Sequence, residues 1–154
     1  MYRSEHVIAA RDALREHGVE YMFIGKGAAI VQGFSDATQD IDIYPRNDEE
    51  NNRRLLAALG ELGFELGGVV REEILRGKVF IQIRGPFDLD LVFAPDGFES
   101  YVEAMKFKIE ADGCPVLSIE GIIRSKRAAG RMKDRESLRR LELFREYLDA
   151  KKRR

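Results

Sequence analysis

Two short stretches of the sequence place pairs of aspartates at alternate positions. Asp40 and Asp42 alternate with two isoleucines, and Asp88 and Asp90 alternate with large apolar residues. Strict alternation is typical of a β-strand, which puts both acids of a pair on one face, roughly 6–7 Å apart. Like charges that close repel each other, and a hard cation such as Mg²⁺ offsets that repulsion. If the two strands are neighbours, the sequence predicts a divalent-cation site; the alternative is a solvated acidic edge.

A glycine-rich turn precedes the first acid pair. Gly25 ends the apolar run 21–25, and Lys26 and Gly27 begin a short predicted helix over 26–33. Glycines at such a turn let a ligand approach the backbone closely, and a helix begins with free N–H groups that suit a phosphate. The turn therefore indicates a phosphate-binding position, with a plain tight turn as the alternative.

The elements that must position these residues follow from periodicity and from capping signals. We expect a polar loop over 34–39 and a turn at 67–68, with the rest of 64–76 ambiguous. The expected helices cover 4–17, 26–33, about 48–62, 97–107, 119–130 and 133–150, and the expected strands cover 21–25, 40–44, 78–84, 87–93 and a hairpin within 108–118. Strands and helices alternate irregularly, which predicts an α+β fold with a mixed sheet and flanking helices.

Composition and charge bound the possible functions. A chain of 154 residues suits a single domain over 1–154, with 44% hydrophobic and 34% charged residues. Its one cysteine, Cys114, and its charged N-terminal residues predict a cytoplasmic protein without a signal peptide, and no apolar run predicts a membrane span. Residues 1–118 carry a net charge of −8 and residues 119–154 a net charge of +7. The basic helical segment 119–154 indicates an anionic partner such as a nucleotide or RNA, or else a solvated helix beside an acidic body.

Three stretches together resemble a known family. They are FIGKGAAIVQGFSDATQDIDIYP, FDLDLVFAPDGF and SIEGIIRSKRAAGRMKDRESLRRLE, within about residues 20–147. Their order and spacing resemble the nucleotidyltransferase superfamily with the polymerase-beta-like fold, and more narrowly the small bacterial AbiEii- and MenT-toxin-like members. The resemblance implies a Mg²⁺ (or Mn²⁺) enzyme that transfers a nucleotidyl group from an NTP to a hydroxyl of RNA, a small molecule or a protein. It also implies a possible toxin–antitoxin role with an antitoxin partner.

The resemblance assigns roles to individual residues. Asp40 and Asp42 match the metal-binding pair, and Asp90 matches the third carboxylate, which also acts as a base on the attacking hydroxyl; Asp88 is the second choice. The matching nucleotide-binding positions are Gly25, Lys26, Gly27, Thr38, Lys126 and Arg131, the last two within a C-terminal motif that also includes Gly130, Lys133 and Asp134.

Two positions depart from the family pattern. Lys26 replaces the second glycine or serine of the turn, and Asp36 stands where the family often has an arginine. An anion near a triphosphate weakens its binding, so these positions predict a changed substrate or a degenerate member that binds nucleotide or a protein partner without catalysis. A structural domain with solvated acids is the third hypothesis.

Overall fold

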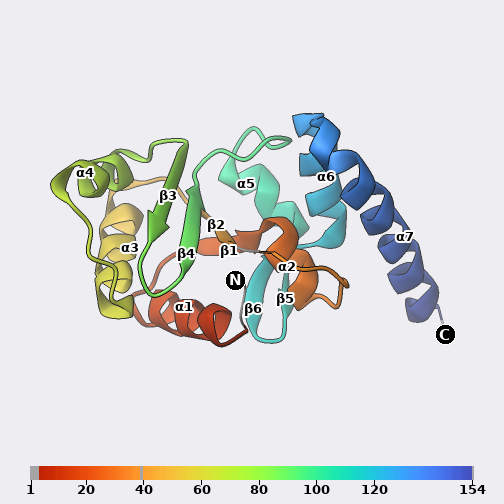
Figure 1. Cartoon of the computed structure of the whole chain (residues 1–154), viewed down its shortest axis with the longest axis horizontal. Coiled ribbons are helices and arrows are strands. Elements are labelled where there is room, and N and C mark those ends of the chain that lie inside the picture. The colour runs from red at the N-terminus through yellow and green to blue at the C-terminus, as the bar shows by residue number, and fades with distance from the viewer. Residues whose placement is uncertain (1–3, 39, 154) are drawn as a thin grey trace.

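A computed structural model of the chain contains a six-stranded mixed sheet with the strand order β3-β4-β2-β1-β6-β5 (Figure 1). The structure describes residues 4–38 and 40–153; the predicted loop position 39 and the ends of the predicted domain, 1–3 and 154, lie outside it. The strands are β1 (Tyr21–Ile24), β2 (Ile41–Pro45), β3 (Phe80–Arg84), β4 (Asp88–Val92), β5 (Lys108–Ala111) and β6 (Cys114–Leu117). β2 pairs with β4 and β1 with β6 in parallel, whereas the other neighbours are antiparallel.

Helices flank this sheet on both sides, which confirms the predicted α+β class. The α-helices are α1 (Ser4–Glu16), α2 (Gly25–Val31), α3 (Glu49–Leu62), α4 (Gly68–Arg76), α5 (Tyr101–Ala104), α6 (Ile119–Ala129) and α7 (Arg135–Lys152), and two 3₁₀ turns are η1 (Met105–Phe107) and η2 (Met132–Asp134). In Figure 1, α1 and α3 lie on one side of the sheet, and α5 and α6 lie on the other. Over residues 4–38 and 40–153, no helix combines the length and the apolar character that crossing a bilayer requires.

Two helices differ from the sequence prediction. α4 occupies most of the segment left ambiguous, because Gly67 is the extended residue before the helix and Gly77 ends it in a left-handed conformation. The predicted helix over 97–107 is shorter than expected. Gly97 has a φ of +94°, and the Ser100 hydroxyl accepts the Glu103 N–H at 3.1 Å, so the helix begins only at Tyr101.

The two faces of the sheet carry different residues. The register aligns Asp42 with Asp90 and Asp90 with Gln82, so these polar side chains share one face of three adjacent strands. The isoleucines and leucines between them are buried on the other face, in the main hydrophobic core. Along β3 the burial alternates, with Phe80, Gln82 and Arg84 exposed. The acid-bearing face is therefore open to solvent at its β3 end.

Buried Asn51 joins three elements near the other end of this sheet. Its side-chain oxygen accepts the Glu20 N–H at 2.8 Å, and its amide group donates to the carbonyls of Glu20 at 2.9 Å and Arg46 at 2.7 Å. Asp48 caps α3 by accepting the Asn51 N–H at 2.8 Å. The start of β1, the end of β2 and the start of α3 are thus held by one side chain.

Replacing Asn51 tests that junction. Asn51→Ala leaves the Glu20 N–H without its partner and removes one of the two hydrogen bonds that each of the Glu20 and Arg46 carbonyls accepts, and we expect the free energy of unfolding to fall by about 2 kcal/mol. Arg53→Ala is the control, because it removes only an exposed pair with Glu49 one helical turn away, at a cost of less than about 1 kcal/mol. Urea unfolding measures both variants, and equal midpoints would contradict the proposed role of Asn51.

Candidate functional site

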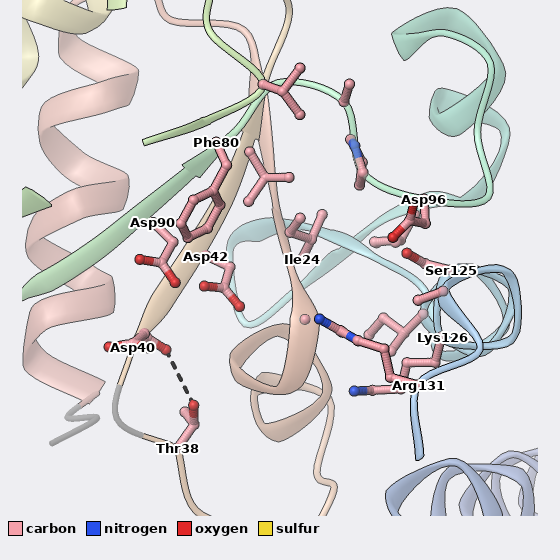
Figure 2. Close-up of a pocket in the computed structure, with 18 of the residues that line it drawn as sticks. Ile24, Thr38, Asp40, Asp42, Phe80, Asp90, Asp96, Ser125, Lys126 and Arg131 are labelled. Carbon is pink, nitrogen blue, oxygen red and sulfur yellow. Dashed lines mark hydrogen bonds between the residues drawn. The ribbon is translucent and has the colours of Figure 1, made fainter. Parts of the chain in front are cut away.

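The parallel pairing of β2 with β4 brings together two acids that are far apart in the sequence. Asp42 lies directly opposite Asp90, with Ile41 opposite Leu89 on the buried face (Figure 2). Asp40 lies just before β2, where the Thr38 hydroxyl donates to its backbone carbonyl at 3.4 Å. The carboxylates of Asp40, Asp42 and Asp90 all line one cavity of about 520 Å³.

Asp88, the second choice for the third acid, lies elsewhere on the same strand face. Its carboxylate pairs with Arg84 on the neighbouring β3 at 4.0 Å, and Asp88 does not line the cavity. Its side chain keeps about a third of its surface exposed to water. The structure therefore brings Asp90, rather than Asp88, next to Asp42.

The carboxyls of Asp42 and Asp90 perturb each other strongly. Burial, together with the hydrogen bond and charge of Asp90 and the charge of Asp40, raises the pKa of Asp42 to about 8 against the opposing effect of Lys126. The pKa of Asp90 is also raised, mainly by burial, although hydrogen bonds from Asp42 and Gln82 lower it. Asp42 therefore retains a proton near neutral pH.

Gly25 makes room for this acid. Its φ is +70°, and a Cβ built on it would lie 2.4 Å from Oδ2 of Asp42. Any larger residue would displace the Asp42 carboxylate as well as strain the backbone. A glycine is therefore required at position 25 for a steric reason as well, because β2 approaches the start of α2 closely there.

Cationic side chains form another wall of the cavity. Lys126 and Arg131 both line it and both bind the buried Asp134, with Lys126 Nζ at 3.4 Å from Oδ1 and Arg131 Nε at 2.6 Å from Oδ2. Burial acts to raise the pKa of Asp134, but the hydrogen bond from Arg131 and the two positive charges hold that pKa below its usual range. Asp134 therefore stays ionised and orients both cations, whose charges remain beside the cavity.

Lys26 and Asp36 pair with each other outside the cavity lining. Lys26 Nζ lies 3.4 Å from Oδ2 of Asp36, and Nη2 of Arg140 on α7 lies 2.7 Å from the same oxygen. The Arg140 guanidinium also lies over the Phe34 ring, 5.3 Å from its centroid. Two cations offset the charge of Asp36, so the expected repulsion of a triphosphate by this residue is reduced. Like Lys26, Gly27 does not line the cavity, whereas Gly25 and Thr38 do.

The cavity also contains residues that the sequence analysis did not single out. They include Val79 and Phe80 on one side and Asp96 and Ser125 on another. Phe80 could have been identified from the sequence, because the alternation in KVFIQIR places this aromatic residue on the polar side of its strand. Asp96 and Ser125 could not have been identified in this way, because a loop residue and a helix residue are brought to the cavity only by the tertiary fold.

The acid pair suits a hard cation. Over residues 4–38 and 40–153, no three acidic, histidine or cysteine side chains are arranged closely enough to hold one ion among themselves. Mg²⁺, however, usually takes one or two carboxylates and completes its shell with water and substrate phosphates. In the same part of the chain, Oδ1 of Asp90 is buried without a hydrogen-bond partner. Two facing carboxylates, a third nearby and an oxygen without a partner fit such an ion.

Comparisons with known proteins support the fold. No protein-family model and no curated protein matches the chain. Its structure is similar to the crystal structure of a candidate nucleotidyltransferase from Thermotoga maritima, with a TM-score of 0.57 and 23% sequence identity over 90% of this chain and 93% of that one. At that identity, the likeness establishes a shared nucleotidyltransferase-like fold.

The raised pKa of Asp42 makes stability depend on pH. Because the folded pKa of about 8 exceeds the ordinary value of about 4, the folded state holds a proton that the unfolded state loses between these values. The free energy of unfolding should therefore fall as pH rises from 4 to 8. Asp42→Asn cannot ionise, and we expect it to be more stable than the parent chain at pH 8.5 by about 1–3 kcal/mol.

Urea unfolding in EDTA at pH 5 and pH 8.5 measures this difference. Asp88→Asn is the matched control, since Asp88 lies on the same sheet face outside the cavity. Its free energy of unfolding should differ little from that of the parent chain at both pH values. An Asp42→Asn variant that gains nothing on going to pH 8.5 would refute the buried, protonated state of Asp42.

Proposed function

We propose that this protein is a Mg²⁺-dependent nucleotidyltransferase that transfers a nucleotidyl group from an NTP to a hydroxyl acceptor. The observation that carries the proposal is the facing pair Asp42 and Asp90 beside a wall formed by Lys126 and Arg131. Phosphoryl chemistry needs negative charge to hold cations and positive charge to receive the leaving diphosphate. Both occur within one cavity of a nucleotidyltransferase-like fold.

Asp40, Asp42 and Asp90 would hold Mg²⁺, with Mn²⁺ as an alternative of similar ligand preference. When bound, the ions supply charge neutralisation of the triphosphate and a lowered pKa of the acceptor hydroxyl. Because an ion displaces the proton of Asp42, binding should weaken as pH falls. Gln82, which lies directly opposite Asp90 on β3, would orient that carboxylate.

The transfer itself assigns one task to each wall of the cavity. The acceptor oxygen forms a bond to the α-phosphorus, its proton passes to Asp90, and the bond from the α-phosphorus to the bridging oxygen breaks. The pyrophosphate leaves with its charge facing Lys126 and Arg131, which Asp134 orients. Gly25 and Thr38 line the same cavity and would contact the nucleotide.

RNA, a small molecule or a protein could supply the acceptor hydroxyl, and a role as the toxin of a toxin–antitoxin pair belongs to the same proposal. One observation favours a second candidate, a module that binds nucleotide or a protein partner without transfer. Lys26, at the proposed phosphate turn, pairs with Asp36 and contributes no side chain to the cavity lining. The two candidates differ in a single measurable step, the appearance of a labelled acceptor.

Labelling with α-³²P NTPs and Mg²⁺ tests catalysis, with total RNA and total protein as acceptors. We expect Asp90→Asn to lower transfer on the order of a hundredfold or more, because it removes a ligand and the base together. Asp88→Asn should stay within about twofold of the parent chain, since Asp88 lies on the same strand outside the cavity. Equal losses in both variants would contradict the assignment, and no labelling with any acceptor would favour the binding module.

Metal binding has its own readout in thermal unfolding. Mg²⁺ at a concentration well above its dissociation constant should raise the Tm by several degrees, because a ligand of the folded state stabilises by about 2.7 kcal/mol at one hundred times Kd. EDTA should reverse the rise, Asp42→Asn should lose it, and Asp88→Asn should keep it. A rise that Asp42→Asn retains would place the cation elsewhere on the chain.

A further inference from the structure

Two exposed apolar side chains line the cavity beside the acids. Val79 is 59% exposed and Phe80 is 51% exposed, and both contribute to the lining. Phe80 lies on β3 opposite Val92, on the same face as Asp90, and Gln82 two residues along the strand lies directly opposite Asp90. Figure 2 shows the Phe80 ring next to Asp90 and Asp42, with Lys126 and Arg131 beyond Asp42, on the side away from Asp90.

The order of groups across the cavity follows from the sheet. β3 carries Phe80 at one edge, β4 carries Asp90, and β2 carries Asp42. Figure 2 shows Lys126 on the Asp42 side of the acid pair, which is the β2 side. The cavity therefore runs from an aromatic wall, past the acids, to a cationic wall.

The Phe80 ring has a free face. Within the described part of the chain, ring contacts join many of the other aromatic side chains, for example Phe64 with Phe87 and Phe98 with Phe107, but none involves Phe80. A half-exposed phenyl ring in water forgoes the favourable burial that most such rings obtain. A planar ligand ring stacked on it would supply that burial.

The direction of the proposed reaction decides which substrate faces Phe80; this step rests on the proposed function. In-line displacement places the attacking oxygen and the leaving group on opposite sides of the α-phosphorus. The leaving pyrophosphate lies toward Lys126 and Arg131, so the acceptor approaches from the Phe80 side.

We propose that Phe80, supported by Val79, is a specificity-determining residue that stacks on a planar ring of the acceptor. The acceptor is then a nucleoside or nucleotide whose base lies beside the hydroxyl that attacks, either as a free mononucleotide or as the end of an RNA strand. Stacking of a base on an aromatic side chain changes affinity by about 5- to 150-fold on alanine substitution, and it tolerates every base because each has a π face.

Binding is measured without turnover by ¹⁹F NMR of the full chain carrying 4-fluorophenylalanine at its nine phenylalanines. Phe80→Leu assigns the Phe80 resonance. Adenosine monophosphate with Mg²⁺ should shift that resonance, and ribose 5-phosphate, which lacks the base, should not. A short oligoribonucleotide that binds at least tenfold more tightly than adenosine monophosphate identifies an RNA end, and equal binding identifies the free nucleotide. Equal shifts by adenosine monophosphate and ribose 5-phosphate would overturn the proposal.

Variants separate stacking from folding and from catalysis. Phe80→Ala should weaken binding of adenosine monophosphate about tenfold or more, Phe80→Tyr should keep it, and Val102→Ala, an exposed apolar position outside the cavity, should not change it. When a methylene-bridged ATP analogue is added first, adenosine monophosphate should still shift the Phe80 resonance. If the analogue alone shifts that resonance and also prevents adenosine monophosphate from binding, Phe80 stacks on the base of the donor NTP and the proposal is wrong.

Failure of the proposed function has a different signature. If no acceptor is ever labelled but adenosine monophosphate still shifts the Phe80 resonance, the chain binds a base at this wall and transfers nothing. If an acceptor is labelled and Phe80→Ala leaves its KM and the monophosphate affinity unchanged, the stacking inference alone fails.

Discussion

The site depends on one unfavourable interaction, the approach of two carboxyls across a parallel strand pair. Asp42 and Asp90 can face each other only because Ile41, Ile43 and their leucine partners are buried on the opposite side of β2 and β4. A slip of one residue in either strand would exchange the faces and bury a charge in the core. The hydrophobic core thus sets the register, and the register imposes the repulsion that a proton relieves here and that a cation would relieve in the proposed enzyme.

The cationic side of the site repeats one arrangement. A carboxylate with little exposed surface holds two positive side chains in each case: Asp134 holds Lys126 and Arg131, and Asp36 holds Lys26 and Arg140. Part of the positive charge of segment 119–154 therefore serves internal ion pairs rather than a partner. The difference between the two clusters is location, since Lys126 and Arg131 line the cavity and Lys26 does not.

Local patterns predicted most of the strands, because each depends on neighbours within a few residues. The alternation around Asp40, Asp42 and Asp90 identified the acid-bearing strands and their polar face without the fold. Strand order could not be read in the same way, since the pairing of β2 with β4 depends on packing across a long crossover. Likewise Asp36 looked like an isolated anion, because its partner Arg140 lies 104 residues away in the sequence. The glycines around residue 67 indicated a turn, while in the structure they begin α4.

Arg140 also gives α7 a mechanical connection to the acids. Besides its ion pair with Asp36, Arg140 donates a hydrogen bond to the Ser35 carbonyl at 3.3 Å. This one side chain therefore binds two successive residues shortly before Asp40. α7 is 18 residues long, and Figure 1 shows it extending away from the sheet to the C-terminal end. A force that tilts this helix acts as on a lever arm, and the load is carried through Arg140 to the Ser35 carbonyl, five residues before the first carboxylate of the site.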